Sequence, residues 1–201
     1  MKQMALEIEK FVLKQLKRND EMLYYIHGYL SSPNSTKGTI LKQKLEVKSI
    51  KYRDCEPEDL IISDCLKRIQ DEIKDDVDPV LIGSSLGGFL SAKMALNNPE
   101  IKRIILFNPA IIPKDYDIRK IEGMPLRILE EMMEPRFFSE KIKARINIFC
   151  GTLDDTVPNK WVIDFAKAQE ANIKFLHDDH SLSGNTQKLP KYIEKILIKK
   201  D

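Results

Sequence analysis

Short apolar runs recur along the chain, separated by longer stretches in which apolar residues return every three or four positions. A short run bounded by polar or turn-forming residues is typical of a strand buried in a sheet, whereas the longer spacing is typical of a helix with one buried face. The runs predict six strands, at residues 22–26, 47–52, 79–83, 103–107, 145–149 and 173–176. The helical spacing predicts helices at 35–46, 57–74, 86–96, 158–170 and 187–199.

Strands that alternate with helices in this way indicate a parallel sheet, because a helix carries the chain back from the end of one strand to the start of the next. Such crossovers are right-handed and place helices on both faces of the sheet. We therefore expect an α/β protein whose 201 residues form one domain. Residues 1–18 predict one further helix, which would dock on this domain through the apolar side chains of Met4, Ile8, Phe11, Val12 and Leu16.

Residues 109–143 interrupt the alternation, because prolines and a glycine stand where a crossover helix would be expected. Pro125 can open a short helix, on which Leu126, Leu129 and Met133 would share one face. We interpret the segment as a short lid-like insertion. Its larger side chains either line a small apolar pocket or pack on the sheet as core, and these side chains are Met132, Met133, Phe137 and Phe138.

Two adjacent serines stand in the stretch LIGSSLGG, residues 81–88, which joins a predicted strand to a predicted helix. The positions two before and two after Ser85 are Gly83 and Gly87, which gives the pattern G-x-S-x-G, whereas the same offsets from Ser84 fall on larger side chains. In a sharp strand-to-helix turn the backbones leave no room for side chains at these glycines, while the serine hydroxyl is exposed at the tip. Ser85 is therefore the candidate nucleophile, and the alternative is a tight turn without chemistry.

A serine hydroxyl becomes an effective nucleophile when a general base takes its proton and a carboxylate orients that base. The chain has three histidines, and His177 and His180 both follow the last predicted strand, where the carboxyl edge of the sheet would face Ser85. We favour His180, because it lies further into the loop and precedes the flexible stretch S-L-S-G, over His177, which could be packed at the strand end.

Two candidate carboxylates, Asp154 and Asp155, follow the preceding predicted strand. One of them could instead be a turn or N-cap residue before the helix that begins at Pro158. With either aspartate, the chain order serine, aspartate, histidine is the one expected for a nucleophile on this kind of sheet.

The third histidine, His27, precedes a glycine in the loop after the first predicted strand. Attack on a carbonyl builds negative charge on its oxygen, which two backbone N–H groups normally stabilise. We expect these donors from Leu86, the residue after the nucleophile, and from Tyr29 in the first loop. His27 would then shape this loop as a buried, hydrogen-bonded histidine rather than act as the base.

Charge and cysteine content restrict the partners and the compartment. The 33 basic and 31 acidic residues leave a net charge of +2 and are spread along the chain, which does not favour nucleic acid or an anionic membrane as a partner. No stretch reaches the roughly 18 apolar residues of a membrane span, and the N-terminus lacks the apolar core of a signal peptide. The spacing of the three cysteines does not fit a metal site and is typical of free thiols, so we expect a cytoplasmic protein without a bound metal. The stretch STKGT does not match a phosphate-binding loop, and we expect no cofactor.

Five stretches in this order, Y-I-H-G-Y, G-S-S-L-G-G, F-N-P-A, G-T-L-D-D-T-V-P and D-D-H-S-L-S-G, resemble motifs of the α/β-hydrolase superfamily, and more narrowly of its small, nearly capless serine esterases. The resemblance covers roughly residues 20–198. The residues directly before His180 are H-D-D, whereas relatives commonly have a glycine-rich stretch there. This departure keeps His177 as the alternative base. The resemblance implies that Ser85 is the nucleophile, His180 the base and Asp154 the orienting acid. It also implies that Tyr29 and Leu86 supply the two oxyanion donors.

The resulting hypothesis is a serine hydrolase that cleaves an ester or thioester through an acyl-enzyme. Because the insertion is too short for a large cap, we expect an open site and a small or medium acyl group. Two alternatives stay open. The fold could bind a ligand after losing its chemistry, or His177, Asp178, Asp179 and His180 could ligate a metal, although no further histidine or cysteine stands nearby to complete such a site.

Overall fold

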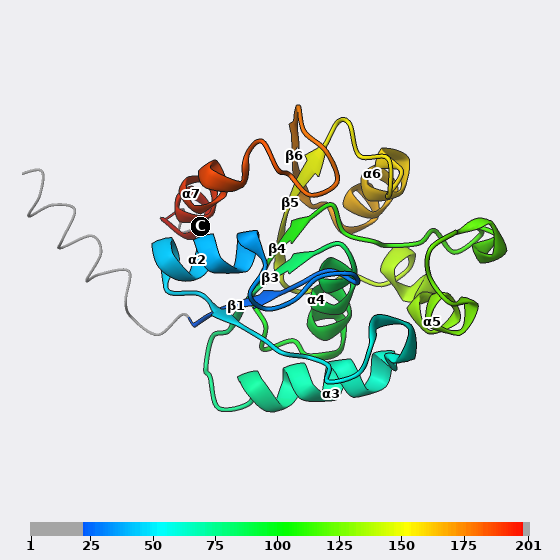
Figure 1. Ribbon diagram of the computed structural model, residues 1–201, viewed down its shortest axis with the longest axis horizontal. Coiled ribbons are helices and arrows are strands. Elements are labelled where there is room, and N and C mark those ends of the chain that lie inside the picture. Colours follow the sequence, from blue (N-terminus) through cyan, green and yellow to red (C-terminus); the bar gives the residue numbers. More distant parts are fainter. Residues whose placement is uncertain (1–21, 199–201) are drawn as a thin grey trace, which may run out of the picture.

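Six parallel strands form one sheet in the computed structural model, which describes residues 22–198 (Figure 1). The strand order is β2-β1-β3-β4-β5-β6, so the chain starts near one edge, forms β2 there, and then moves steadily to the other edge. This confirms the predicted α/β class. The helix expected within residues 1–18 lies outside the described residues. The strands are β1 (Leu23–Ile26), β2 (Lys48–Ser49), β3 (Val80–Ser84), β4 (Arg103–Phe107), β5 (Arg145–Gly151) and β6 (Asn172–Leu176).

Helices cover both faces of this sheet, with α2 and α7 on one face and α3, α4 and α6 on the other (Figure 1). In β4, Ile104 and Leu106 face the core under α3, α4 and α6, whereas Ile105 and Phe107 face α2 and α7. A strand buried on both faces reads as a continuous apolar run, which is why the strand signals were clear. The helices are α2 (Thr36–Leu45), α3 (Ile62–Ile73), α4 (Leu86–Asn97), α5 (Leu126–Met132), α6 (Asn159–Gln169) and α7 (Leu189–Ile198).

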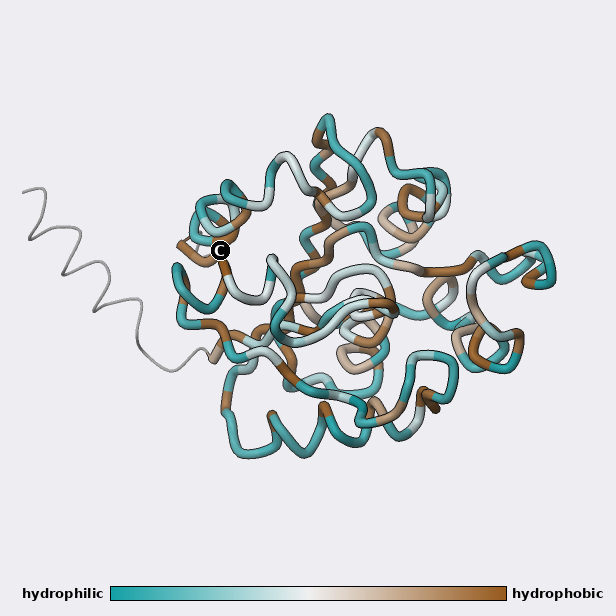
Figure 2. Tube along the Cα trace, viewed as in Figure 1, coloured by the Kyte–Doolittle hydropathy of each residue, from teal (hydrophilic) through white to brown (hydrophobic). Residues whose placement is uncertain are grey.

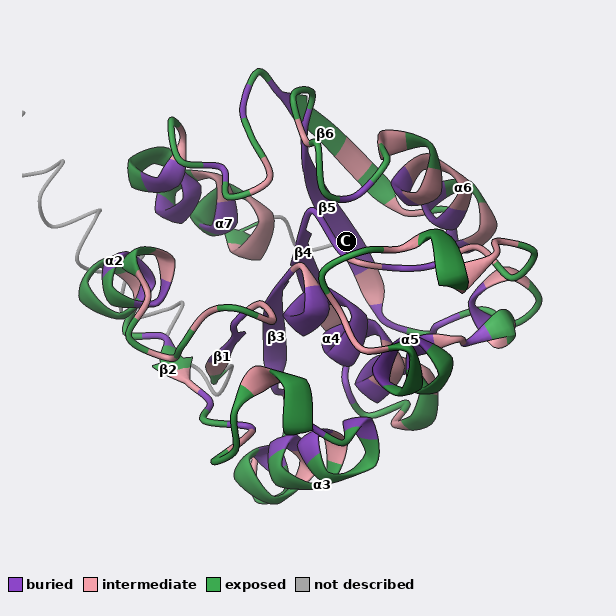
Figure 3. Cartoon of the chain, turned by 45° about the vertical axis from the view of Figure 1, so that its right-hand side comes forward, coloured by how far each residue is buried: buried purple, intermediate pink, exposed green. Residues whose placement is uncertain are grey.

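Burial and hydropathy follow this layering. Figure 3 shows the central strands and most of α4 buried, while the outer turns of α3 are exposed. Figure 2 shows the same division as hydrophobic colour along the strands and hydrophilic colour along the outer surface of α3. Helix α4 is therefore packed from several sides, so the turn at its N-terminus is held by core contacts. Within residues 22–198, no helix has both the length and the apolar character needed to cross a membrane.

The strand predicted at 47–52 is shorter than expected, because only Lys48–Ser49 pair with β1. Beyond these residues the chain leaves the sheet, and the Tyr52 hydroxyl donates to the carbonyl oxygen of Gly28 at 3.2 Å. This contact with the loop after β1 takes the place of further strand pairing.

The helix predicted from residue 57 begins at Ile62, after a single 3₁₀ turn at Pro57–Asp59. Side chains of α5 determine this start. Glu131 accepts the backbone N–H of Ile62 at 2.8 Å, and Arg127 donates to the carbonyl oxygen of Leu60 at 2.9 Å. Because these partners lie almost 70 residues away, the local sequence did not indicate the break.

The insertion at 109–143 leaves the sheet after β4 and returns at β5, and it contains α5 and two 3₁₀ turns, at Ile118–Lys120 and Pro135–Phe138. Helix α5 forms where Pro125 predicted it, but its buried face is rotated from the predicted one. Leu126 is 44% exposed. The buried residues of α5 are Ile128, Leu129 and Met132.

Candidate active site

Ser85 occupies the sharp turn between the end of β3 and the start of α4, with φ 54° and ψ −117°. Residues other than glycine rarely adopt this left-handed backbone conformation, which persists where surrounding contacts enforce it. The Ser85 N–H donates to the carbonyl oxygen of Phe107 at 2.9 Å, and its carbonyl oxygen accepts the N–H of Ala110 at 3.1 Å. Ser84, by contrast, is buried at the end of β3 with its hydroxyl hydrogen-bonded to Tyr25.

The two glycines that flank Ser85 lie against backbone. A Cβ atom on Gly83 would lie 2.2 Å from the carbonyl oxygen of Gly87. A Cβ atom on Gly87 would lie 2.0 Å from the carbonyl oxygen of Ile26. Neither position has room for a side chain, which is the physical reason for the spacing G-x-S-x-G around Ser85.

His180 and Asp154 are brought together from the loops after β6 and β5. The Nδ1–H of His180 donates to both carboxylate oxygens of Asp154, at 2.9 and 2.8 Å, and the Asp154 side chain is fully buried. Because the carboxylate accepts from Nδ1, the neutral ring carries its lone pair on Nε2, where it can accept a proton. This pair therefore has the tautomer that a general base requires.

The alternatives to this pair have other environments. Asp155 is exposed and accepts the hydroxyl of Thr156 at 3.2 Å. His177 is also exposed, so it is not packed at the strand end, and its Nδ1 lies 3.4 Å from the Thr152 hydroxyl.

The carboxylates between the two histidines support the loop itself. Asp178 accepts the N–H groups of Gly184 and Asn185, at 3.1 and 2.9 Å, and Asp179 accepts the hydroxyl of Ser183 at 2.6 Å. With His180 bound to Asp154, the four residues do not converge on a common point. Across residues 22–198, no three His, Cys, Asp or Glu side chains form a group that could hold a metal ion. The metal-ligand alternative has no support in this geometry.

The loop after β1 lies against Ser85. A Cβ atom on Gly28 would be 3.4 Å from the Ser85 Cβ and 4.0 Å from its Oγ, so Tyr29, the next residue, begins close to Ser85. Leu86 is the first residue of α4, and an N–H in the first turn of a helix has no acceptor within that helix. The positive end of the helix dipole also lies here. The two predicted oxyanion donors thus belong to segments on either side of Ser85.

His27 shapes this loop from within the core, where it is 2% exposed. Its Nδ1–H donates to the carbonyl oxygen of Gly28 at 2.8 Å, and its ring stacks on Tyr52 with centroids 4.3 Å apart. Burial lowers the pKa of His27 to about 4. The ring is therefore neutral at physiological pH and supports Gly28 as a buried, hydrogen-bonded group.

A hollow of about 580 Å³ opens beside this loop, and its walls come from the residues that follow Tyr29, the start of α2 and the chain after β2. Its lining is mixed, because hydroxyl groups and one guanidinium alternate with apolar groups. Arg53 is fixed there by donating to the carbonyl oxygen of Ser31 at 3.1 Å. The lining residues are Leu30, Ser31, Ser32, Ser35, Thr36, Arg53, Cys55, Glu56 and Pro57.

The predicted acyl-pocket residues divide into two pairs. Met132 and Phe137 are buried, and Phe137 packs edge-on against Phe89 and Phe165 with centroids 5.9 and 5.5 Å apart. For these two, the alternative of ordinary core packing describes the structure. Met133 and Phe138 are only partly buried, at the border of the same core, and remain the two that could reach a substrate.

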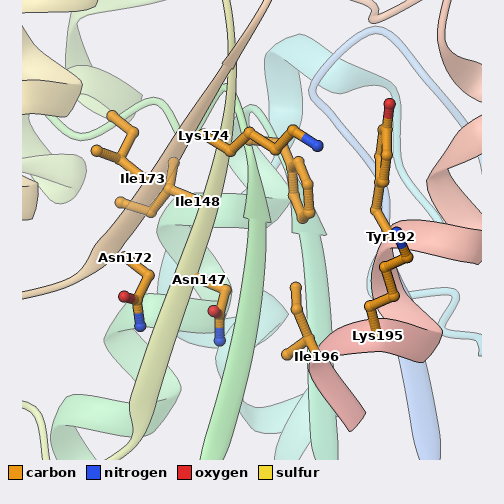
Figure 4. Close-up of a pocket in the computed structure, with 9 residues that line it drawn as sticks. Asn147, Ile148, Asn172, Ile173, Lys174, Tyr192, Lys195 and Ile196 are labelled. Atoms are coloured by element: carbon orange, nitrogen blue, oxygen red, sulfur yellow. The ribbon is translucent and has the colours of Figure 1, made fainter. Parts of the chain in front are cut away.

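A second hollow, of about 190 Å³, lies on the face of the sheet under α7 (Figure 4). Its walls include Asn147 and Asn172, near the starts of β5 and β6, and Tyr192 of α7. Lys174 covers one side, with its Nζ 3.8 Å from the centroid of the Tyr192 ring. Asp154 and His180 follow the other ends of these strands, so this hollow is separate from the site around Ser85.

Asn108, which follows β4, is a buried site residue that the sequence reasoning quoted within F-N-P-A but gave no role. Its amide binds the loop that carries His180 and the end of β5 that precedes Asp154. The available signal was an amide side chain, followed by proline, at the end of an otherwise apolar strand.

Comparisons with known proteins agree with this architecture. The model of the uncharacterised protein family UPF0227 matches residues 22–197. No sequence among the curated proteins matches the chain.

Solved structures match over most of the chain. Est1E from Butyrivibrio proteoclasticus is 18% identical, with a TM-score of 0.70 over 89% of this chain and 87% of that one. The α/β-hydrolase domain-containing protein 10 from mouse is 15% identical, with a TM-score of 0.66 over 90% of each chain. A monoacylglycerol lipase from Paleococcus ferrophilus is 14% identical, with a TM-score of 0.67 over 88% of this chain and 93% of that one. At these identities the likeness establishes the fold, which is the α/β-hydrolase fold.

Proposed function

The chain belongs to the uncharacterised protein family UPF0227 and has the α/β-hydrolase fold, and we propose that it is a serine hydrolase of carboxylic esters or thioesters. One observation carries the proposal. His180 is bound through Nδ1 to the buried carboxylate of Asp154, while Ser85 occupies a left-handed turn at the same edge of the sheet. A fold alone does not select a reaction, so the argument rests on these side chains. The structural relatives named as a lipase and a hydrolase-domain protein agree with this reaction class.

In the first half of the reaction, the Ser85 Oγ attacks the substrate carbonyl carbon while His180 Nε2 takes the hydroxyl proton. Asp154 stabilises the imidazolium that forms. The carbonyl oxygen becomes an oxyanion, which accepts hydrogen bonds from the N–H groups of Leu86 and Tyr29. Collapse of this tetrahedral intermediate breaks the bond to the leaving alcohol or thiol, which takes the proton from His180, and leaves an acyl group on Ser85.

In the second half, water enters the site and His180 takes one of its protons as the oxygen attacks the acyl carbon. The second tetrahedral intermediate collapses and releases the carboxylic acid, and the proton returns to Ser85. No bound metal or cofactor is needed to balance these steps. The N-terminus of α4 and the loop at Gly28 supply the charge stabilisation.

The surroundings of Ser85 support a small or medium acyl group. Met132 and Phe137, which could have formed an apolar acyl pocket, are committed to the core, and the apolar lining of the hollow beside Tyr29 is interrupted by hydroxyl groups and the Arg53 guanidinium. A long alkyl chain would find little continuous apolar surface there. The segment 109–143 contains only one α-helix, α5, which agrees with an open site rather than one beneath a large cap.

The test is hydrolysis of p-nitrophenyl esters of graded chain length, with a short-chain thioester assayed in parallel. We expect activity on short chains that falls by about 10⁴-fold or more in Ser85→Ala. The matched control is Ser84→Ala, which removes the adjacent, buried hydroxyl and should stay active. Faster turnover of long-chain esters would contradict the proposed substrate size. Undiminished activity of Ser85→Ala, or wild-type protein that neither hydrolyses these substrates nor reacts with a fluorophosphonate probe, would overturn the proposal and leave a ligand-binding role.

A further inference from the structure

Asn108 connects the segments that carry the three proposed catalytic side chains. It is fully buried directly after β4, with a left-handed backbone at φ 42°. Its Nδ2 donates to the carbonyl oxygen of His180 at 2.8 Å and to that of Asp179 at 3.2 Å. Its Oδ1 accepts the N–H of Gly151, the last residue of β5, at 2.7 Å. Both ends of one amide are thus bound to backbone on either side of it.

The backbone beside Asn108 holds the nucleophile. Phe107, one residue earlier, accepts the N–H of Ser85, and Ala110, two residues later, donates to the carbonyl oxygen of Ser85. The Asn108 N–H donates to Phe149 of β5 at 3.0 Å, which fixes the register of the turn. The segment 107–110 is therefore hydrogen-bonded to the turn at Ser85, to the end of β5 and to the loop of His180.

The loop of His180 is attached at other points as well, since the Leu153 N–H donates to the carbonyl oxygen of Asp178 at 2.9 Å and Leu182 is fully buried in the core, but neither contact is made by His180. The loop's own side chains brace it internally, and Lys37 of α2 holds its outer side by donating to the carbonyl oxygen of Ser181 at 2.6 Å. On the inner side it lies so close to β5 that a Cβ on Gly151 would be 2.5 Å from the carbonyl oxygen of Asp179. The Asn108 amide is what binds the backbone of His180 itself.

We propose that Asn108 is a positioning residue for the reaction, whose amide N–H group sets the place of His180 relative to Ser85 while its oxygen sets the strand end that leads to Asp154. The inference rests on the proposed function and adds to it a residue that touches no substrate. Misplacement of a catalytic group by about 1 Å can cost about 10²-fold in rate. Loss of the Asn108 donor should therefore reduce turnover rather than substrate binding.

Two variants separate this role from a general contribution to folding. Asn108→Asp keeps an oxygen that can accept from Gly151 and a side chain that tolerates a left-handed backbone, but it replaces the donor with an oxygen that faces two carbonyls. Asn108→Gly keeps the left-handed backbone and removes all three side-chain hydrogen bonds.

The matched control is Gln169, a buried amide of α6 that also binds three backbone groups. Its Nε2 donates to Phe137 and Glu140, at 2.6 and 2.8 Å, and its Oε1 accepts the N–H of Ile142 at 2.8 Å. Gln169→Glu makes the same chemical change as Asn108→Asp in a buried site that holds the end of the insertion instead of His180.

The experiment measures kcat and KM for p-nitrophenyl butyrate at a temperature at which circular dichroism shows every variant folded. We expect Asn108→Asp and Asn108→Gly to lower kcat by about 10²-fold with little change in KM. Gln169→Glu should keep the wild-type kcat even if its unfolding midpoint falls as far as those of the Asn108 variants. Wild-type kcat in both Asn108 variants, or an equal loss in Gln169→Glu, would overturn the positioning role.

A second readout does not depend on activity. The chain has three histidines, so the ring signals of His180 can be assigned in ¹⁵N-labelled protein by comparison with His180→Gln. We expect the downfield Nδ1 proton that is shared with Asp154 to be present in wild type and in Gln169→Glu, and lost or broadened in Asn108→Asp. An unchanged signal in Asn108→Asp would contradict the inference. If wild type shows no hydrolysis that depends on Ser85, the proposed function fails, while this signal still decides whether Asn108 places His180.

Discussion

The carboxylate of Asp154 binds the ring of His180 and its own turn at the same time. While the His180 Nδ1–H donates to both oxygens, Oδ1 also accepts the backbone N–H groups of Thr156 and Val157, each at 2.9 Å. The two roles that the sequence divided between adjacent aspartates, turn residue and partner of the histidine, fall on one. Because its orientation is fixed from the turn, the carboxylate is already ordered for the role that the proposed reaction gives it.

Replacement of Asp154 by asparagine should therefore lower kcat by about 10⁴-fold, because an amide no longer selects the tautomer that leaves the His180 Nε2 free. Asp155→Asn is the matched control, because its carboxylate is exposed and contacts only the Thr156 hydroxyl among the described side chains. We expect its kcat to stay near the wild-type value. Steady-state kinetics of the two variants on one short-chain ester decide the point, and similar losses in both would contradict the assignment.

His27 makes folding stability depend on pH. Burial lowers its pKa to about 4 in the folded protein, so below pH 6.5 the unfolded chain binds a proton that the folded chain does not. The free energy of unfolding should fall as the pH drops from 6.5 towards 4, by about 1.4 kcal/mol per pH unit, or about 2 kcal/mol between pH 7 and 5.

Urea unfolding of wild type and His27→Asn at pH 7 and 5 measures this contribution. Asparagine can place its amide nitrogen near the position of Nδ1 and does not titrate, so the variant should lose about 2 kcal/mol less than wild type over this interval. His177→Gln, which removes an exposed histidine, should behave as wild type. Equal pH dependence in wild type and His27→Asn would show that His27 is not kept neutral by the fold.

The close approach of α4 to β1 leaves no room for a Cβ atom at Gly87, in the turn around Ser85. A Cβ atom there would meet three backbone atoms of Ile26 and His27, the farthest at 2.6 Å. We expect Gly87→Ala to cost about 3 kcal/mol or more, because backbone cannot yield as a side chain can. Gly184→Ala is the control, since its nearest neighbour would lie at 3.5 Å, and chemical denaturation should show a small change. A comparable loss of unfolding free energy in both variants would argue against a clash specific to the turn around Ser85.

The three cysteines should differ sharply in reactivity. Cys55 is exposed, whereas burial raises the pKa of Cys65 and of Cys150 to about 12. Since the thiolate is the reactive form, we expect one thiol to react quickly with Ellman's reagent in the folded protein and all three to react in denaturant. Cys55→Ser should abolish the fast phase. A fast-reacting thiol that persists in that variant would mean that Cys65 or Cys150 opens to solvent.

The central strands could be predicted closely because they are buried on both faces. The apolar run at 103–107 matches β4 at both ends, whereas the run at 47–52 shrank to two paired residues at the edge of the sheet. There the periodicity indicated apolar burial correctly, since Tyr52 is buried, but not strand pairing. The start of α3 also depended on Glu131 and Arg127, which are distant in sequence and supply contacts that no local pattern contains.

For the site, motif spacing singled out Ser85 because the glycine positions follow from steric limits that act over two residues. The geometry places His180 beside Asp154, while the roles of these residues stay predictions until the variants are assayed. Asn108 could not be assigned a role in this way. Its partners lie 43 to 72 residues away and are backbone groups, which leave no signature in side-chain chemistry.

The left-handed backbone at Ser85 bears on how natural selection has acted on this turn. A non-glycine residue in such a conformation costs about 1–3 kcal/mol, and glycine at position 85 would relieve most of it. A lineage that needed only a tight connection between β3 and α4 would gain stability from that replacement. Under the proposed function, the serine in this position gives up some stability for reactivity, a compromise that a fold reduced to ligand binding would be free to abandon.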